Sequence, residues 1–108
     1  MENEWNSLGK KQEEFAVAIA DLILFAHSKT IKVRIKDAFR DPRLHGKYGE
    51  KLGYGAANSV HKLSLAVDLY TENPKNHKEL HDYWDSLGGA PRIENDMNHY
   101  SFKFQNNW

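Results

Sequence analysis

The chain contains no cysteine, which excludes disulfide bridges and thiolate zinc sites and leaves histidine and carboxylate as its strong metal ligands. It has no excess charge either, because 15 basic residues balance 15 acidic ones. A protein without an overall basic field lacks the usual electrostatic signature of nucleic-acid binding. We therefore expect no nucleic-acid partner, and the six histidines become the main candidates for metal chemistry.

Long apolar runs are absent as well. None approaches the ~18 residues that a membrane-spanning helix requires, and the opening residues MENEWN are too acidic and polar for a secretory signal. We therefore expect synthesis in the cytoplasm without stable membrane insertion. A chain of 108 residues suits one domain with a modest core, which buries about 60–70% of the unfolded surface. We expect that domain to be monomeric.

Hydrophobic periodicity predicts a mixed fold. Apolar residues at helical spacing indicate a helix from about Leu8 to Ser28, and a second helix is expected from a cap at Asn76 to Leu87. Alternating apolar and polar residues indicate strands over roughly residues 30–36, 63–70 and 98–104. The pattern predicts an α+β fold in which helices cover one face of a small antiparallel sheet.

The last two predicted strands carry polar groups on the face that turns away from the core. Asp68 leaves the apolar face of its strand, beside the small residues Ser64 and Ala66, and His99 does the same in the final strand. If these faces align, His61, Asp68 and His99 converge. Two neutral imidazoles and one carboxylate, with a fourth position left to water, are typical of catalytic zinc. Taken singly, each of the three is more often a structural hydrogen-bonding residue, and only their coincidence favours a metal site.

The motifs SVHKLSLAVDL and DMNHYSF resemble the pattern SxHxxxLAxDL with [ED]xxH. This is the signature of the zinc D-alanyl-D-alanine carboxypeptidase and L-alanyl-D-glutamate endopeptidase family, and the small phage endolysins are the most similar members. The blocks KKQEEFAVAIADLILFA, DAFRDPRLHGKYG and WDSLGGAPRIENDMNHYS follow in a similar order, so the resemblance covers nearly the whole chain. It implies a hedgehog-like peptidase fold with zinc in a groove on the sheet face opposite the helices. It also implies one catalytic domain over residues 1–108, without a separate cell-wall-binding domain.

The resemblance implies the roles of the central residues. His61, Asp68 and His99 match the zinc ligands, and Asp96 matches the general base that activates the attacking water. Glu94 is a poorer candidate for the base because its spacing to His99 does not match. Carboxypeptidase members usually have glutamate at the position of Asp96, whereas the endolysin endopeptidases have aspartate. The resemblance therefore favours cleavage of the L-Ala–D-Glu bond in the stem peptide of peptidoglycan.

An arginine that stabilises the developing oxyanion is also implied. Arg40 matches its position, and Arg43 is the second candidate. The alternative is that Arg40 forms an ion pair with Asp37 or Asp41 and only holds the loop in place.

Two serines complete the implied substrate site. Ser59 resembles the serine of the family motif and is expected to orient a ligand or a substrate carboxylate, with a local cap as the equal alternative. Ser64 stands where relatives often have glycine or arginine, and it is expected to form the substrate-facing floor.

The remaining histidines carry weaker signals. His77 and His81 are spaced i and i+4, a possible metal pair, but the glutamate of a zincin helix is absent because Lys78 stands there. A solvated helix face is therefore favoured for both. Residues 37–58 show no sustained period, and we expect them to wrap around the cleft. His45, within that segment, is interpreted as a surface residue.

The resemblance implies a phage lysis enzyme that is made in the host cytoplasm and acts in the periplasm or cell wall. Its substrate would be the peptidoglycan stem peptide, and a holin or another permeabilising route would give it access. The sequence is also compatible with two alternatives. One is a D-alanyl-D-alanine carboxypeptidase, and the other is a non-catalytic, zinc-stabilised module that binds peptides.

Overall fold

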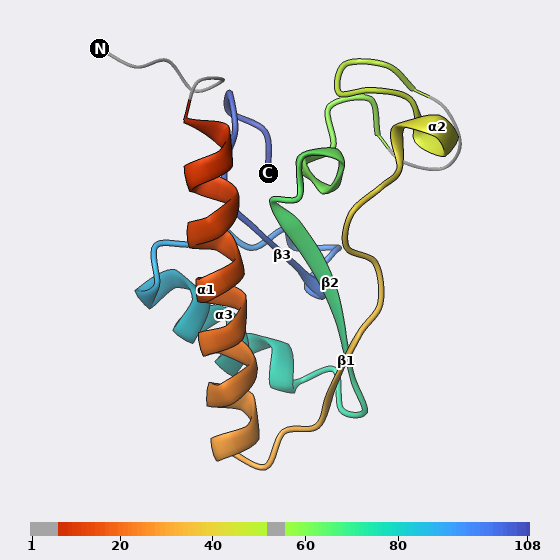
Figure 1. Cartoon of the computed structure of the whole chain (residues 1–108). Helices are drawn as coiled ribbons and strands as arrows, with labels where there is room; N and C mark the ends of the chain where they lie inside the picture. Colours follow the sequence, from red (N-terminus) through yellow and green to blue (C-terminus); the bar gives the residue numbers. More distant parts are fainter. Residues whose placement is uncertain (1–6, 52–55) are drawn as a thin grey trace.

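The computed structural model describes residues 7–51 and 56–108, and the MENEWN segment lies outside them. Within this part, three α-helices accompany a three-stranded antiparallel sheet, which confirms the predicted α+β class (Figure 1). The elements in chain order are α1 (Leu8–Ser28), β1 (Val33–Ile35), α2 (Pro42–His45), the 3₁₀ turn η1 (Val60–Leu63), β2 (Ala66–Thr71), α3 (Asn76–Ser86) and β3 (His99–Ser101).

The sheet has the order β1-β2-β3, so β2 is its central strand. In register, Val33 lies opposite Thr71 and His99 lies opposite Asp68. All three strands are shorter than predicted. The second begins later than residue 63 because the Ser59 side chain accepts a hydrogen bond from the His61 amide and caps η1. Ser64 then adopts a left-handed conformation (φ 56°), which makes it a turn residue and not a strand residue.

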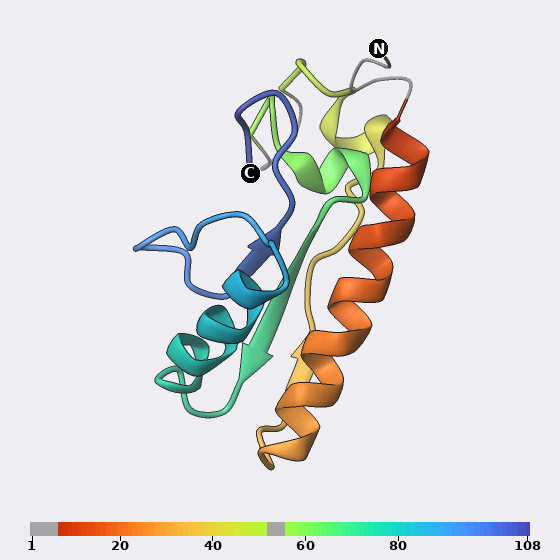
Figure 2. The same ribbon diagram turned by 90° about the vertical axis from the view of Figure 1, so that its left-hand side faces the viewer.

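Helix α1 has the predicted bounds and runs alongside the strands over most of the length of the molecule (Figure 2). Its buried side chains include Phe15, Leu22 and Ala26, which recur at helical spacing. Phe15 meets Trp84 of α3 edge to face at 5.9 Å between ring centroids. The helix therefore ties α3 to the rest of the core. None of the helices in the described ranges combines the length and hydrophobicity that a membrane crossing requires.

Helix α3 begins at Asn76, which is the first helical residue and not the predicted cap. The cap position belongs to Lys75 and has no side-chain cap hydrogen bond, while the Asn73 side chain accepts from the Lys75 amide at 3.1 Å. The helix ends at Ser86 with Leu87 as its C-cap, so its end agrees with the predicted end at Leu87. A side chain at Gly89 would place its Cβ 2.1 Å from Trp84 Nε1, so this position requires glycine.

The interpretation of His77 and His81 as a solvated helix face is wrong. Their side chains are 6% and 0% exposed, because together with Leu80 and Trp84 they occupy the i, i+3, i+4, i+7 stripe that faces the core. His77 Nδ1 lies 2.6 Å from the Tyr100 hydroxyl, and His81 Nε2 donates to the Met97 carbonyl at 2.7 Å. Both histidines are therefore structural hydrogen-bonding residues of the core.

The segment before η1 is less irregular than predicted, because it contains the short helix α2. His45, at its end, is buried, so its interpretation as a surface residue is also wrong. The segment is held by Lys62, whose side chain is 4% exposed. The Lys62 ammonium donates to the backbone carbonyls of Glu50 and of Ala57 (3.4 Å). Residues 52–55, including the glycines of that stretch, lie outside the described ranges.

Candidate metal centre

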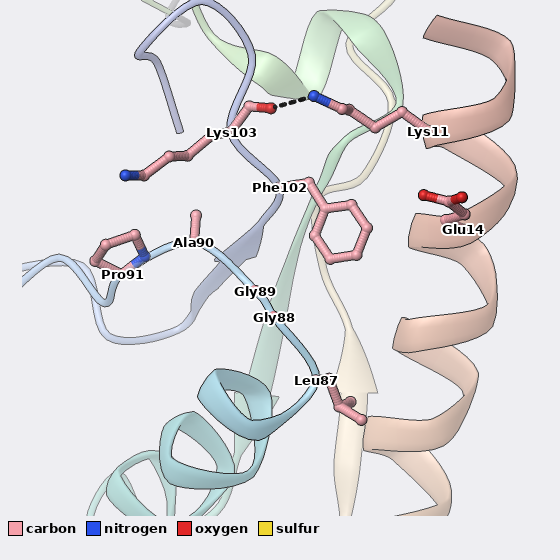
Figure 3. A pocket seen from close by; sticks show the side chains of 9 residues that line it. All are labelled: Lys11, Glu14, Leu87, Gly88, Gly89, Ala90, Pro91, Phe102 and Lys103. Carbon is pink, nitrogen blue, oxygen red and sulfur yellow. Dashed lines mark hydrogen bonds between the residues drawn. The ribbon is translucent and has the colours of Figure 1, made fainter. Parts of the chain in front are cut away.

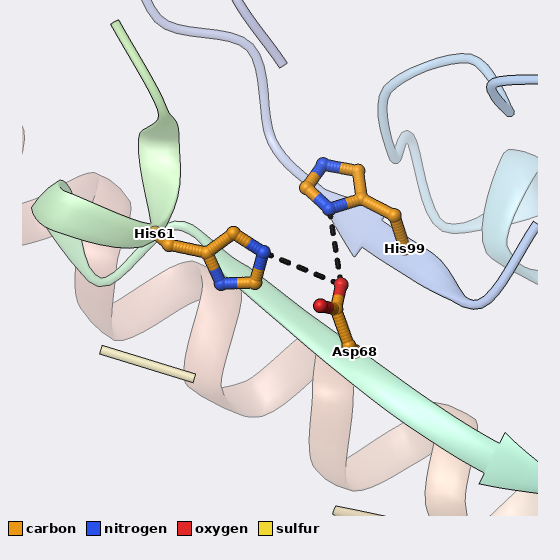
Figure 4. A group of neighbouring side chains, drawn as sticks. All are labelled: His61, Asp68 and His99. Atoms are coloured by element: carbon orange, nitrogen blue, oxygen red, sulfur yellow. Dashed lines mark hydrogen bonds and ion pairs between the residues drawn. The ribbon is translucent and has the colours of Figure 1, made fainter. Parts of the chain in front are cut away.

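The three predicted ligands come together from three different elements. His61 lies in η1, Asp68 in β2 and His99 in β3, and one potential ligand atom from each lies within 4.8 Å of the others (Figure 4). Asp68 Oδ1 is 3.3 Å from His61 Nε2 and 3.2 Å from His99 Nδ1. Helix α1 passes behind β2, on the face opposite these side chains. The group therefore lies across the sheet from α1, which agrees with the predicted placement.

Local structure determines how His61 presents its ring. Its amide is held by Ser59, and its carbonyl accepts from the Arg40 amide at 3.1 Å. Its Nδ1 lies 2.7 Å from the Ala38 carbonyl, and because a carbonyl only accepts, Nδ1 carries the hydrogen. Nε2 is therefore the ring nitrogen that faces Asp68, and in the neutral ring it is the one free to bind a metal. A backbone carbonyl that orients the ring in this way is the usual outer partner of a metal-binding histidine.

The electrostatics of the group favour a cation. Burial by itself would raise the pKa of Asp68, but hydrogen bonds and charge interactions with His61 and His99 outweigh it and hold the pKa well below its usual range. An ionised carboxylate oxygen thus lies 3.3 Å from His61 Nε2 and 3.2 Å from His99 Nδ1. A cation held between the three atoms could replace the hydrogens that the two imidazoles share with the carboxylate. Two imidazole nitrogens and a carboxylate oxygen form a donor set that fits zinc.

A cavity of about 380 Å³ opens beside the three residues. Its lining also includes Arg40, Ser59 and Asp96, so most of the predicted site residues share one space. A larger cavity of about 600 Å³ lies between α1 and the turn after α3 (Figure 3). Its walls, which include Lys11, Glu14 and Phe102, contain none of the predicted site residues. The smaller cavity is the better candidate because it contains the clustered ligand atoms.

Asp96 reaches the cavity from a turn. Its amide donates to the Ile93 carbonyl at 2.9 Å, and its own carbonyl accepts from the His99 amide at 3.1 Å. The turn therefore couples the position of Asp96 to that of His99. Glu94 is exposed and is not part of the cavity lining.

Arg40 lines the cavity and also forms the ion pair considered as its alternative role. Its Nε lies 3.2 Å from Asp37 Oδ2, and its Nη1 donates to Ser59 Oγ at 2.8 Å. Ser59 likewise acts as the local cap, because it accepts from the His61 amide. These contacts connect Arg40, Ser59 and His61 into one hydrogen-bonded network. The substrate-related roles of Arg40 and Ser59 stay predictions.

Two predicted substrate residues lie elsewhere. The Arg43 side chain is 88% exposed and binds Asp41 at 2.7 Å, and its hydrogen bonds lower the pKa of Asp41 to about 2. Arg43 does not line the cavity. Ser64 forms the turn between η1 and β2 and is also absent from the lining. Their proposed contacts with substrate are untested by this geometry.

Sequence reasoning missed Trp108, which lines the same cavity. The tail folds back because Phe104 and Asn107 exchange backbone hydrogen bonds of 2.8 and 2.9 Å. The Asn107 side chain also donates to the Tyr48 hydroxyl at 2.8 Å. The consecutive asparagines before Trp108 are the available signal, because asparagine favours such turns.

No family model, curated protein or solved structure matches the chain. Its function is therefore inferred from the site itself. The described residues contain a buried group of two histidines and one aspartate that could hold a metal ion. Such a group is compatible with a metal-dependent hydrolase.

Proposed function

We propose that the chain is a zinc-dependent peptidoglycan peptidase of the phage endolysin type, which hydrolyses the L-Ala–D-Glu bond of the stem peptide. The observation that carries this proposal is the convergence of His61, Asp68 and His99, with ligand atoms within 4.8 Å, beside the cavity that Asp96 also lines. The resemblance of SVHKLSLAVDL and DMNHYSF to the motifs of that family supports the same assignment.

Zinc is the metal that the donor set favours, because imidazole and carboxylate are its common ligands at catalytic sites. Bound there, it would polarise the peptide carbonyl and lower the pKa of a water molecule to about 7. His61 would hold it through Nε2, with its ring oriented by Ala38, and His99 would hold it through Nδ1. Asp68 would contribute the negative charge that a divalent cation requires.

Asp96 is the proton carrier in this proposal. Its carboxylate accepts a proton from the attacking water as the new C–O bond forms, and returns it to the amine as the C–N bond breaks. Arg40 supplies positive charge where the carbonyl oxygen becomes negative, a contribution on the order of 3 kcal/mol for comparable donors. Asp37 and Ser59 hold the guanidinium in one orientation. The cation is thus positioned before the substrate arrives.

The stem peptide of the host wall is the substrate in this proposal, and a holin or another permeabilising route provides access to it. The enzyme would act in the periplasm or cell wall after synthesis in the host cytoplasm.

Digestion of purified muropeptides, followed by mass spectrometry, tests the proposal. The zinc-loaded chain is expected to separate L-Ala from D-Glu and to release the rest of the stem. Release of a single terminal D-alanine would instead identify a D-alanyl-D-alanine carboxypeptidase. Binding of the peptide without any cleavage, in a chain with a full complement of zinc, would identify the non-catalytic binding module.

A further inference from the structure

A row of cations extends from the metal centre along the same face of the sheet. Lys32, Arg34 and Lys36 alternate along β1 and its flanks, and all three are exposed. The register places Arg34 opposite Tyr70, which lies two residues after Asp68 on β2. Residues opposite each other, and residues two apart on one strand, share a face. Arg34, Tyr70 and Asp68 therefore lie on one face.

A local irregularity brings Lys36 next to Asp68. The Lys36 amide donates to the Asp68 carbonyl at 2.8 Å, but the Asp68 amide donates to the carbonyl of Asp37 at 2.7 Å. Two residues of one strand thus oppose one residue of the other, which is the pattern of a β-bulge. The two bulge residues have separate partners. Asp37 binds Arg40 of the cavity, whereas the Lys36 ammonium lies over the ring of Tyr70.

Tyr70 holds two cations on the exposed face. Arg34 Cζ and Lys36 Nζ each lie 5.4 Å from the centroid of its ring, which is itself 41% exposed. Such contacts restrict long, flexible side chains before any ligand binds, which lowers the entropic cost of binding. A shallow cavity of about 220 Å³ lies at this end, and Glu72 is the acidic residue in its lining. Lys32 and Arg34 thus share this lining with one carboxylate, and Lys36 adds a third cation over the Tyr70 ring, although the whole chain is neutral.

We propose that Lys32, Arg34 and Lys36, grouped around Tyr70, form a subsite for carboxylates of the substrate peptide. The inference rests on the proposed function and adds a substrate class to it. The peptide that follows the scissile L-Ala–D-Glu bond has a free carboxylate on its glutamate and further carboxylates beyond. A strand rises about 3.3 Å per residue, so the row begins beside Asp68 and continues about 7 Å along β2 to Tyr70. The site thus favours stem peptides with free carboxylates over amidated ones.

Binding of two synthetic tetrapeptides tests the subsite. One is L-Ala-γ-D-Glu-diaminopimelyl-D-Ala with free carboxylates, and the other has its glutamate and diaminopimelate carboxylates amidated. Calorimetric titration is performed on the full chain, both zinc-loaded and chelator-treated. We expect the free peptide to bind the wild type about ten-fold more tightly than the amidated one, because charge complementarity is lost on amidation.

The variant Arg34→Gln/Lys36→Gln is expected to lose that preference and to bind both peptides equally. The charge-preserving variant Arg34→Lys/Lys36→Arg is expected to retain it. Lys10→Gln/Lys78→Gln removes the same charge from exposed positions outside the row and serves as the matched control. Circular dichroism and a melting curve establish that each variant is folded.

Several results would overturn the subsite: no preference in the wild type, an unchanged preference in Arg34→Gln/Lys36→Gln, or an equal loss in the Lys10 and Lys78 control. Absence of any binding by the wild type would overturn it as well. Cleavage is assayed separately on the wild type and on Arg34→Gln/Lys36→Gln. Charge-dependent binding without cleavage would refute the proposed hydrolysis and leave the subsite standing, whereas cleavage with unchanged KM in the Arg34 and Lys36 variant would refute the subsite alone.

Discussion

Asp68 and His99 face each other across the β2–β3 pair, and Asp68 Oδ1 lies 3.2 Å from His99 Nδ1. The antiparallel register makes this contact, because directly opposite side chains lie on one face of the sheet. The same carboxylate oxygen meets His61 Nε2 at 3.3 Å. Asp68 is therefore the residue that joins the two histidines, and the consequences of its removal are the most direct test of the metal centre.

Asp68→Asn is expected to abolish zinc binding at neutral pH. The substitution keeps the shape of the side chain but removes the negative charge between two imidazoles. Loss of a direct ligand should exceed the ~10–100-fold weakening that follows removal of an outer partner. Metal analysis after dialysis measures the result. Asp82→Asn, on the exposed surface of α3, is the control and should retain zinc. Equal zinc content in the two variants would refute the assignment of Asp68.

Asp96→Ala is expected to bind zinc as the wild type does but to lose catalysis by ~10²–10⁴-fold. Asp96 lines the cavity without belonging to the clustered ligand group, so its removal leaves the metal donors intact. Lysis of cells with permeabilised outer membranes measures activity, and metal analysis measures occupancy. Glu94→Ala, two residues earlier and outside the cavity lining, should behave like the wild type. If zinc and fold survive in Asp96→Ala and lysis is unchanged, the proton-transfer role is wrong.

Lys62→Met is expected to lower the free energy of unfolding by about 1–3 kcal/mol, because part-buried backbone carbonyls lose a charged donor. The Lys62 ammonium donates to the carbonyls of both Glu50 and Ala57, and so joins two positions of the chain that precedes Ser59. Chemical denaturation measures the change. Lys47→Met, at an exposed position nearby, is the matched control and should change stability little. A Lys62→Met chain as stable as this control would show that the Lys62 hydrogen bonds contribute nothing to stability.

The free energy of unfolding is expected to fall as the pH drops below about 6.5, the ordinary pKa of a histidine side chain. Burial lowers the pKa of both His77 and His81, so the unfolded chain binds protons that the folded chain rejects. The two histidines contribute their full share of the free energy of unfolding above the pKa of the unfolded chain. That share is lost as the pH falls through the lowered pKa values of the folded chain. Asp68, whose pKa lies below its usual range, acts only at more acidic pH. Urea denaturation between pH 7.5 and 5 measures the effect.

The comparison of His77→Gln and His27→Gln isolates that pH effect. His27 is exposed in the last turn of α1, and its replacement should leave the pH dependence unchanged. His77→Gln should flatten it, even if the variant is less stable at neutral pH. An identical slope in the two variants would contradict the assignment to the buried histidines.

The structural features that depend on a local sequence pattern could be predicted. The α1 bounds follow from a long apolar period, which needs no partner elsewhere in the chain. The ligand group was predictable from the polar faces of two strands and from the motif around them. The start of β2 could not be predicted in this way. Ser59 caps η1, and this turn replaces the strand that the alternating pattern predicts from residue 63. A histidine stripe in α3 also has the same spacing whether it faces water or the core.

The sequence alone determined the α+β class, the long helix and the identity of the three clustered side chains, because periodicity and residue type are local properties. Tertiary structure alone decided that His77 and His81 enter the core, that Trp108 returns to the cavity, and that Lys36 stands beside Asp68. Those placements depend on which strands pair and which surfaces pack, and such long-range contacts are encoded by no single stretch of residues.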